Sequence, residues 1–356
     1  MRPAWAFLPW FGPRYKIGCL IPLDGEDGRL GIAVLKGLSL ALEVLSSSPA
    51  FKLRVYNTAS DPNYAAMQLK KMQKDGCSLG VALLGQKTAK GVVHMAQKIK
   101  MPLIVMTNER NLELGQVVYR DFVTDQIQLM NLASFALQDL GLHSFIILYP
   151  QNKYGQRYAH LFASAVVQNG GEIRKMFGYP PQKTDFGDII KKIIGYRIAE
   201  SSPEILITHP PTFPFDAIFI ADTSLEATFI ISQFAYYNAR NLIFLGTALW
   251  NNPKFLSNIK QYCRAIYFPS PFNPKAQKPW VRAFVKRYQS AYKELPNYLA
   301  AQAYEIGTII GYLESVAHLD IKGLPQYVQN FPGVTGTTTF LTNGDVDKKI
   351  WIVEVK

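Results

Sequence analysis

The chain has 356 residues, enough for two domains, because a single core rarely grows beyond about 250–300 residues. Hydrophobic residues make up 48% of it and charged residues 18%, which excludes a disordered or fibrous protein. The net charge is +12, but the basic residues are scattered, and no basic run or zinc-finger spacing supports nucleic-acid binding. The densest groups, Lys70–Lys74 and Lys348–Lys349, are predicted to be solvated ends of helices and strands.

Cysteines and apolar runs limit the class of protein further. Cys19, Cys77 and Cys263 lie far apart and form no CxxC pair, so the sequence gives no disulfide framework. No run of 18 apolar residues indicates a membrane span. The start, Met1–Arg14, lacks the apolar core and cleavage site of a signal peptide. We therefore expect either a cytoplasmic protein or an exported one whose signal lies upstream.

In chain order, short apolar β-rich runs alternate with longer patterns of helical spacing. Strands are predicted at Tyr15–Pro22, Phe51–Asn57, Leu79–Leu84, Leu103–Thr107, Phe145–Tyr149, Ala217–Ala221 and Leu242–Thr247. Helices are predicted at Leu30–Leu45, Tyr64–Asp75, Thr88–Lys100, Asp125–Leu140, Gly155–Asn169, Leu225–Ala239, Trp280–Lys293 and Tyr298–His318. This alternation predicts an α/β protein with two doubly wound parallel-sheet lobes.

Local signals fix several element ends. Asp61-Pro62 predicts an N-cap and first turn, and Gly141 and Gly170-Gly171 are typical of helix ends. The end of the chain departs from the alternation, with two consecutive helices and then a β segment at Thr337–Phe340 and Val346–Val355. Asn343-Gly344 between these last runs predicts a hairpin turn.

Motifs spread over residues 15–356 resemble the leucine/isoleucine/valine-binding protein family, the type I periplasmic binding proteins. Each motif is weak alone, but their shared order makes the resemblance specific. The residues that carry it are Lys16–Gly25 with Gly31 and Gly37, Pro102–Ile104, Tyr154-Gly155, Asp216–Phe219, Leu245–Thr247, Ala300–Glu305, and Gly333–Gly336 with Phe340 and Asn343–Asp345.

The resemblance implies two lobes, joined by three crossings, that close on a small ligand without a cofactor. By this analogy residues 1–14 are an extension, residues 15–123 and 274–334 form lobe 1, and residues 124–273 and 335–356 form lobe 2. It also implies a periplasmic or cell-envelope protein that delivers an amino acid or related molecule to an ABC permease. Contact with the membrane is expected only through a possible lipid anchor upstream.

Ligands of open parallel sheets bind beyond the carboxyl ends of the strands, so the loops there contain the candidate site. By the resemblance, Thr88 and Thr107 hold a ligand carboxylate, Tyr154 lines the cleft, and Asp222 or Glu226 faces an ammonium group. Asn108, next to Thr107, is a further ligand-binding candidate. Trp250 is expected either to stack on the ligand or to wedge between the lobes. The remaining candidates are Gln86 and Lys87.

Gln86 and Lys87 depart from the small hydroxyl residues of the family. Their bulk could fill the carboxylate position, or Lys87 could pair with an anionic ligand. Structural roles remain open for several candidates: Thr88 and Asp125 as helix caps, Tyr154 as loop packing, and Lys87 as a solvated lysine.

Enzymatic function has little support in the sequence. The five histidines show no paired spacing for a metal, and neither a GxSxG elbow nor a GxxxxGK[ST] phosphate loop occurs. We therefore expect a binding protein without catalytic residues, metal or cofactor.

A second function fits the same fold. The segment Asp216–Pro253 resembles a subgroup of envelope lipoproteins that activate penicillin-binding proteins. Gln233–Tyr237 and the exit from Leu245-Gly246-Thr247 to Trp250-Asn251 carry that resemblance. On this alternative the partner is a cell-wall synthase rather than a permease.

Overall fold

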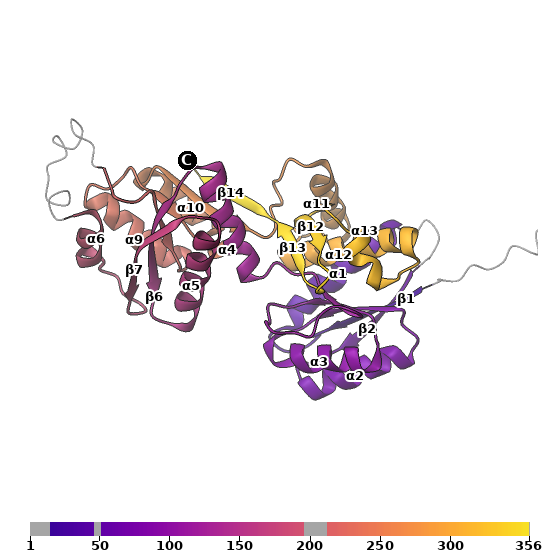
Figure 1. Cartoon of the computed structure of the whole chain (residues 1–356). Coiled ribbons are helices and arrows are strands. Elements are labelled where there is room, and N and C mark those ends of the chain that lie inside the picture. The colour runs from indigo at the N-terminus through magenta and orange to yellow at the C-terminus, as the bar shows by residue number, and fades with distance from the viewer. Residues whose placement is uncertain (1–14, 46–50, 196–211, 356) are drawn as a thin grey trace, which may run out of the picture. The chain divides into compact units, whose positions relative to one another are not determined.

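The computed structural model of the chain describes residues 15–45, 51–195 and 212–355 (Figure 1). Contacts divide the chain into two compact units. Unit 1 comprises Met1–Thr124 and Phe272–Lys349, and unit 2 comprises Asp125–Pro271 and Ile350–Lys356. The chain therefore crosses between the units three times. The predicted α/β class with parallel-sheet cores is confirmed.

Unit 1 is built on a five-stranded parallel sheet in the order β2-β1-β3-β4-β5. Its strands are β1 (Tyr15–Ile21), β2 (Phe51–Asn57), β3 (Leu79–Leu83), β4 (Leu103–Met106) and β5 (Val118–Arg120). The helices are α1 (Gly28–Leu45), α2 (Pro62–Lys74), α3 (Gln86–Ile99), α11 (Pro279–Tyr292), α12 (Tyr298–Ala317) and α13 (Leu324–Tyr327). A small antiparallel sheet of β11 (Phe331–Gly333), β12 (Gly336–Phe340) and β13 (Val346–Lys349) completes the unit.

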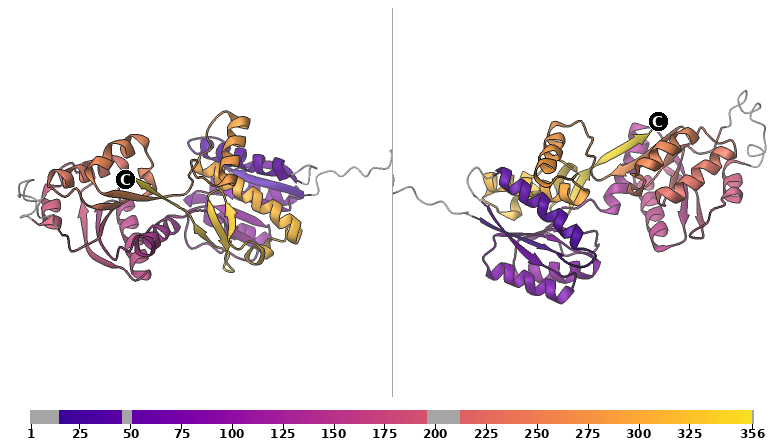
Figure 2. Two further views of the ribbon diagram at one scale, coloured as in Figure 1. Left: turned by 90° about the horizontal axis from the view of Figure 1, so that it is seen from above. Right: turned by 180° about the vertical axis from the view of Figure 1, so that it is seen from behind.

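Two glycines of the family motif explain how α1 packs. A Cβ at Gly31 would lie 1.7 Å from the Pro22 carbonyl oxygen, and one at Gly37 would lie 2.0 Å from the Ala300 carbonyl oxygen. Helices α1 and α12 therefore approach so closely that only glycine fits between them at position 37. The pair lies on the opposite face of the sheet from α2 and α3 (Figures 1 and 2).

Unit 2 is built on a six-stranded sheet in the order β14-β10-β9-β8-β6-β7, in which β14 alone is antiparallel to its neighbour. The strands are β6 (Ser144–Pro150), β7 (Glu172–Tyr179), β8 (Ala217–Ile220), β9 (Ile243–Leu245), β10 (Ala265–Ser270) and β14 (Trp351–Val355). One apolar core joins the sheet to α4 (Asp125–Ser134) and α5 (Lys153–Gln168), and another joins it to α6 (Gly187–Ile194), α9 (Ser224–Tyr236) and α10 (Pro253–Ile259).

Local predictions hold at several element ends. Asp61 caps α2 by accepting a hydrogen bond of 2.7 Å from the Tyr64 backbone N–H. Gly141 and Gly170 take positive φ values after helices, and Asn343-Gly344 forms the turn between β12 and β13. The helix predicted over Asp125–Leu140 is α4 continued by a π-helix at Phe135–Asp139.

The structure corrects the third predicted boundary. Residues 335–349 were expected in lobe 2, but they belong to unit 1, because β12 and β13 pair with each other and with β11. The run Val346–Val355, expected as one β segment, splits between the two units. Only β14 joins unit 2, where it pairs with β10.

Some elements were not predicted from the sequence. Strand β7 contains Glu172, Arg174 and Lys175 and lies at a sheet edge, so it has no continuous apolar pattern. Strands β5 and β10 and helices α6 and α10 were also missed. A further correction concerns Lys348, which was expected to be solvated but is fully buried, whereas Lys70, Lys71 and Lys74 are exposed as predicted.

Candidate ligand-binding site

A pocket of about 430 Å³ lies in unit 1 at the carboxyl ends of β1, β2 and β3. This is the edge at which open parallel sheets bind ligands. Three of the predicted site residues, Gln86, Lys87 and Thr88, line it. The full lining is Pro22, Asp27, Leu30, Thr58, Ser60 and Leu83 through Thr88.

One wall of the pocket is the first turn of α3. Gly85 is the N-cap, with φ −74° and ψ 172°, and no side chain caps the helix. Thr88 is therefore not the cap; its hydroxyl donates a hydrogen bond of 3.1 Å to the Gly85 carbonyl oxygen. An uncapped helix N-terminus attracts negative charge, and the exposed side chain of Lys87 adds a full positive charge. This wall suits an anionic group.

The other wall comes from the loops after β1 and β2. The Ser60 hydroxyl donates a hydrogen bond of 2.7 Å to an Asp27 carboxylate oxygen, which joins the two loops. Ala59 and Ser60 both lie in the left-handed region, with φ of 48° and 52°, a conformation that costs free energy in residues with a Cβ. Sequence reasoning did not name Thr58 or Ser60. Their position directly after β2 was the signal.

Thr107 and Asn108 follow β4, the strand next to β3, but they are not among the residues that line the pocket. The Thr107 side chain is buried, and its hydroxyl oxygen accepts a hydrogen bond of 3.2 Å from the Glu109 backbone N–H. Its observed contact therefore shapes the loop.

The remaining predicted residues belong to unit 2. Asp222 follows β8 and is buried; its carboxylate accepts hydrogen bonds of 2.7 Å from the Tyr179 hydroxyl and 2.8 Å from the Thr223 backbone N–H. Burial raises the pKa of Asp222, and these two bonds lower it by less. Tyr179 was not predicted, because β7 was not recognised as a strand.

Tyr154 lies in the first turn of α5, where its ring stacks on Tyr158 at a centroid distance of 4.3 Å. Asp125 accepts a hydrogen bond of 2.8 Å from the Tyr158 hydroxyl and pairs with Arg157 at 2.8 Å, so it anchors α4 to α5. The Tyr154 hydroxyl is buried beside the Thr247 and Tyr158 side chains, and within the described residues no hydrogen bond of good geometry satisfies it. It is therefore a polar group that a ligand could satisfy.

Glu226 and Trp250 have structural roles that the sequence did not show. Thr223 is the N-cap of α9: its hydroxyl oxygen accepts a hydrogen bond from the Leu225 backbone N–H, and its hydroxyl donates one to the Glu226 carboxylate in the third helical position. Trp250 is fully buried in the core of unit 2, against Phe255, and its indole N–H donates a hydrogen bond of 3.0 Å to the Asp222 carbonyl oxygen. It is thus neither a ligand platform nor a wedge between lobes.

Within the described ranges, no group of three or more His, Cys, Asp or Glu residues could hold a metal ion. Over the same ranges, no helix is both long and apolar enough to cross a bilayer.

The chain matches the family described as periplasmic binding protein over residues 14–356, and it belongs to that family. It spans nearly the whole of several solved structures. A protein from Rhodospirillum rubrum assigned to a branched-chain amino acid ABC transporter has 18% identity and a TM-score of 0.77, with 96% of each chain covered.

Two structures with bound ligands show the same fold. LivJ from Streptococcus pneumoniae, in complex with isoleucine, has 21% identity and a TM-score of 0.58, with 94% of each chain covered. A solute-binding protein from R. palustris, in complex with benzoate, has 16% identity and a TM-score of 0.56, covering 97% of this chain and 94% of that one. At these identities the likeness concerns the fold alone. No curated protein matches the chain.

Proposed function

We propose that this protein is the extracytoplasmic ligand-binding component of an ABC transporter. In this proposal a small molecule enters the pocket of unit 1, unit 2 closes over it, and the closed form is recognised by a membrane permease. Family membership and the placement of Gln86, Lys87 and Thr88 in one pocket support the proposal. The pocket is the observation that carries it.

The pocket also favours a ligand class. The uncapped N-terminus of α3 and the charge of Lys87 suit a carboxylate, and the Asp27 side chain on the other wall suits a donor or an ammonium group. An amino acid or another small carboxylate satisfies both. The solved relatives bound to isoleucine and to benzoate are compatible with either choice.

The test is a thermal-unfolding screen of amino acids, aromatic acids, amides and short peptides. A ligand at a hundredfold excess over its Kd should stabilise the protein by about 2.7 kcal/mol, because it binds only the folded state. No response from any compound in these classes would contradict the proposal.

A matched pair of variants tests the role of Lys87. Lys87→Met should weaken the binding of a carboxylate found in the screen by about 5–50-fold, since it removes a charge-assisted contact. Lys98→Met makes the same charge change at the exposed far end of the same helix and should leave affinity unchanged. Equal effects of the two variants would remove Lys87 from the site.

A second candidate function is binding to a cell-wall synthase. Helix α9 carries large apolar side chains on both its buried and its exposed faces. Leu225, Phe229 and Tyr236 are 62%, 39% and 76% exposed, and their spacing of four and seven places them along one side of the helix. This stripe lies in the segment that resembles the activators.

Pull-down with purified cell-wall synthases tests this candidate. The double variant Leu225→Asp, Tyr236→Ser should abolish capture, whereas Val167→Asp, at a position on α5 that is 64% exposed, should not. Capture that survives the double variant, or absent capture by the wild type, would rule out the stripe as the docking face.

A further inference from the structure

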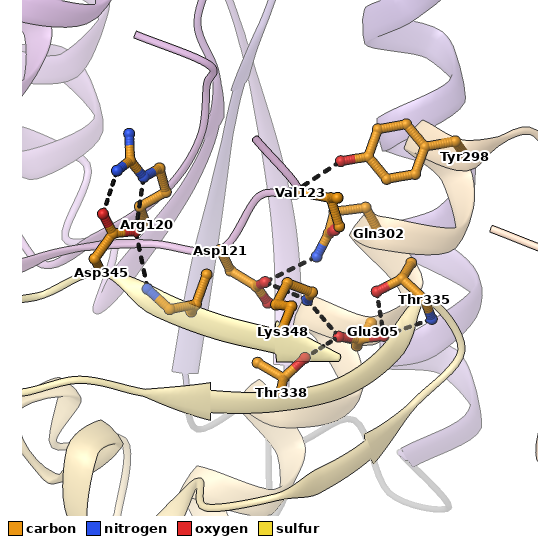
Figure 3. A network of polar contacts seen from close by, with 11 residues as sticks. Arg120, Asp121, Val123, Tyr298, Gln302, Glu305, Thr335, Thr338, Asp345 and Lys348 are labelled. Atoms are coloured by element: carbon orange, nitrogen blue, oxygen red, sulfur yellow. Dashed lines mark hydrogen bonds and ion pairs between the residues drawn. The ribbon is translucent and has the colours of Figure 1, made fainter. Parts of the chain in front are cut away.

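The most unusual feature of unit 1 is a buried ion cluster that the ligand site does not use (Figure 3). The Lys348 ammonium donates hydrogen bonds of 2.6 Å to an Asp121 carboxylate oxygen and 2.7 Å to a Glu305 carboxylate oxygen. All three side chains have zero exposure. A cluster of this kind is weak evidence for stability, because removing the charges from water costs about as much as their attraction returns.

The two carboxylates of the cluster are held differently. Glu305 accepts three more hydrogen bonds, from the Thr335 backbone N–H, the Thr335 hydroxyl and the Thr338 hydroxyl, so both of its oxygens are satisfied. Asp121 shares one oxygen between Lys348 and the Gln302 side-chain amide, while its other oxygen has no partner within the described residues. Glu305 is thus fixed within the unit, and Asp121 depends on α12 and β13.

The cluster lies at the ends of two interunit crossings. Asp121 comes directly after β5. Thr124, three residues later, is the last residue of unit 1 before the first crossing. Lys348 stands one residue before the third crossing, which leaves unit 1 at Lys349. The Val123 backbone N–H also donates a hydrogen bond of 3.1 Å to the Tyr298 hydroxyl on α12. Both chain segments are therefore tied to the same helix.

The same crossings are also tied on their unit 2 sides. Asp125 pairs with Arg157 and Tyr158 of α5, and the Ile350 backbone N–H donates a hydrogen bond of 3.0 Å to the Asn131 side chain on α4. One residue separates positions 123 and 125, and Lys349, which pairs with Thr337 in β13, is followed directly by Ile350. At these two crossings, the backbone angles that can change when the units move are thereby restricted to two short stretches.

We propose that Lys348, Asp121 and Glu305 are positioning residues that clamp two of the three crossings to α12. At these two crossings the clamp confines bending to the short stretches between Val123 and Asp125 and between Lys349 and Ile350. Lys348 joins the two crossing segments, Asp121 holds the first segment, and Glu305 anchors Lys348 to α12. The clamp lets these two crossings bend during a movement of the units without fraying of β5 or β13. This inference rests on the proposed function in one respect, that the units close during ligand binding.

The experiment measures hinge geometry without any ligand. Spin labels at Lys98→Cys in unit 1 and Lys192→Cys in unit 2, both exposed positions, in a Cys263→Ser background report the distribution of distances between the units. Hydrogen exchange of peptides that span residues 117–126 and 344–352 reports local opening. Lys348→Met should broaden the distance distribution and raise exchange in both peptides by about tenfold or more.

Lys70→Met is the matched control, because it removes the same charge from an exposed lysine on α2 of unit 1, away from both crossings, and should change neither measurement. Asp121→Ala covers the case in which Lys348→Met does not fold, since it leaves Lys348 paired with Glu305. It should raise exchange in residues 117–126 and broaden the distances.

The proposal is overturned if a folded variant loses stability while distance widths and local exchange relative to the core stay as in the wild type. In that case the cluster supports unit 1 alone. Failure of the ligand screen would leave both measurements interpretable, so the two proposals can fail separately.

Discussion

The two units each bury a carboxylate near the end of a strand, and they support it in opposite ways. In unit 1 Asp121 faces an ammonium group, and the polar residues around the pocket remain available to a ligand. In unit 2 Asp222 faces a tyrosine hydroxyl and a backbone N–H, and the candidates Glu226 and Trp250 take part in capping and packing. The type of residue that follows a strand therefore does not show whether its side chain is available to a ligand or supports the fold.

The comparison predicts that substitutions at the candidate residues of unit 2 mainly reduce the stability of the protein. Trp250→Ala should show the largest effect, lowering the free energy of unfolding by about 3–5 kcal/mol, because it empties a core position and removes the bond to the Asp222 carbonyl oxygen. Leu249→Ala, at a neighbouring residue that is 51% exposed, should cost about 0.5 kcal/mol or less. Urea unfolding measures both free-energy costs. Equal costs would contradict the core position of Trp250.

Tyr179→Phe tests the support of Asp222. It should cost about 1–3 kcal/mol at pH 7, because the carboxylate loses its side-chain donor while still buried. Burial raises the pKa of Asp222, so its contribution to stability is greatest below the unfolded pKa and falls as the pH rises through the folded pKa. The cost should therefore be smaller in acid than at pH 7, because a protonated carboxyl depends less on the Tyr179 donor. A cost independent of pH would mean that Asp222 is supported by other contacts.

The pH dependence of unit 1 gives the contrasting case. Burial, with the nearby charge of Glu305, raises the pKa of Asp121 to about 6, although Lys348 and the Gln302 amide oppose this. The stability that this group provides is full below its unfolded pKa and is lost as the pH rises through about 6. Asp121→Asn should remove this loss and flatten the stability curve between about pH 5 and 7, by about 1–2 kcal/mol.

Two neighbouring groups set the background of that measurement. Burial acts to raise the pKa of Glu305, but Lys348 and the hydrogen bonds outweigh it and lower the pKa. The contribution of Glu305 to stability is therefore lost only in acid. Burial acts to lower the pKa of Lys348, but the two carboxylates outweigh it and raise the pKa. The contribution of Lys348 to stability is therefore lost only in base. Urea unfolding of wild type and Asp121→Asn from pH 4 to 8 isolates Asp121. Parallel curves for the two proteins would contradict its assignment.

The smallest effect is expected at Glu226. Glu226→Ala and Thr223→Ala should each cost about 0.5–1 kcal/mol, and the double variant should cost less than their sum, because the two side chains share one hydrogen bond at the start of α9. A ligand found by the screen distinguishes the roles. If Glu226→Ala abolishes binding while Thr223→Ala does not, Glu226 contacts the ligand in addition to capping α9.

Much of the fold follows from local sequence. The strands β1 to β4, β6, β8 and β9 and the long helices show either apolar runs or helical spacing, and capping residues such as Asp61 and Gly170 mark their ends. Ordered motifs extend this to the family, and two of their residues, Gly31 and Gly37, have a packing reason in this structure. The α3 loop of the pocket was predictable in the same way, from its place after a strand.

Other features depend on contacts between residues far apart in the chain. Edge strand β7 is stabilised by its pairing with β6, so its charged sequence carries no signal. The third crossing falls at Lys349 because β13 pairs with β12 within unit 1 and β14 pairs with β10 in unit 2. Lys348 and Lys349 are the same residue type side by side, yet one is buried in an ion cluster and the other is exposed. The sequence determined which elements form, and the tertiary structure alone decided which polar side chains they enclose, since burial depends on the partner surface rather than on the residue.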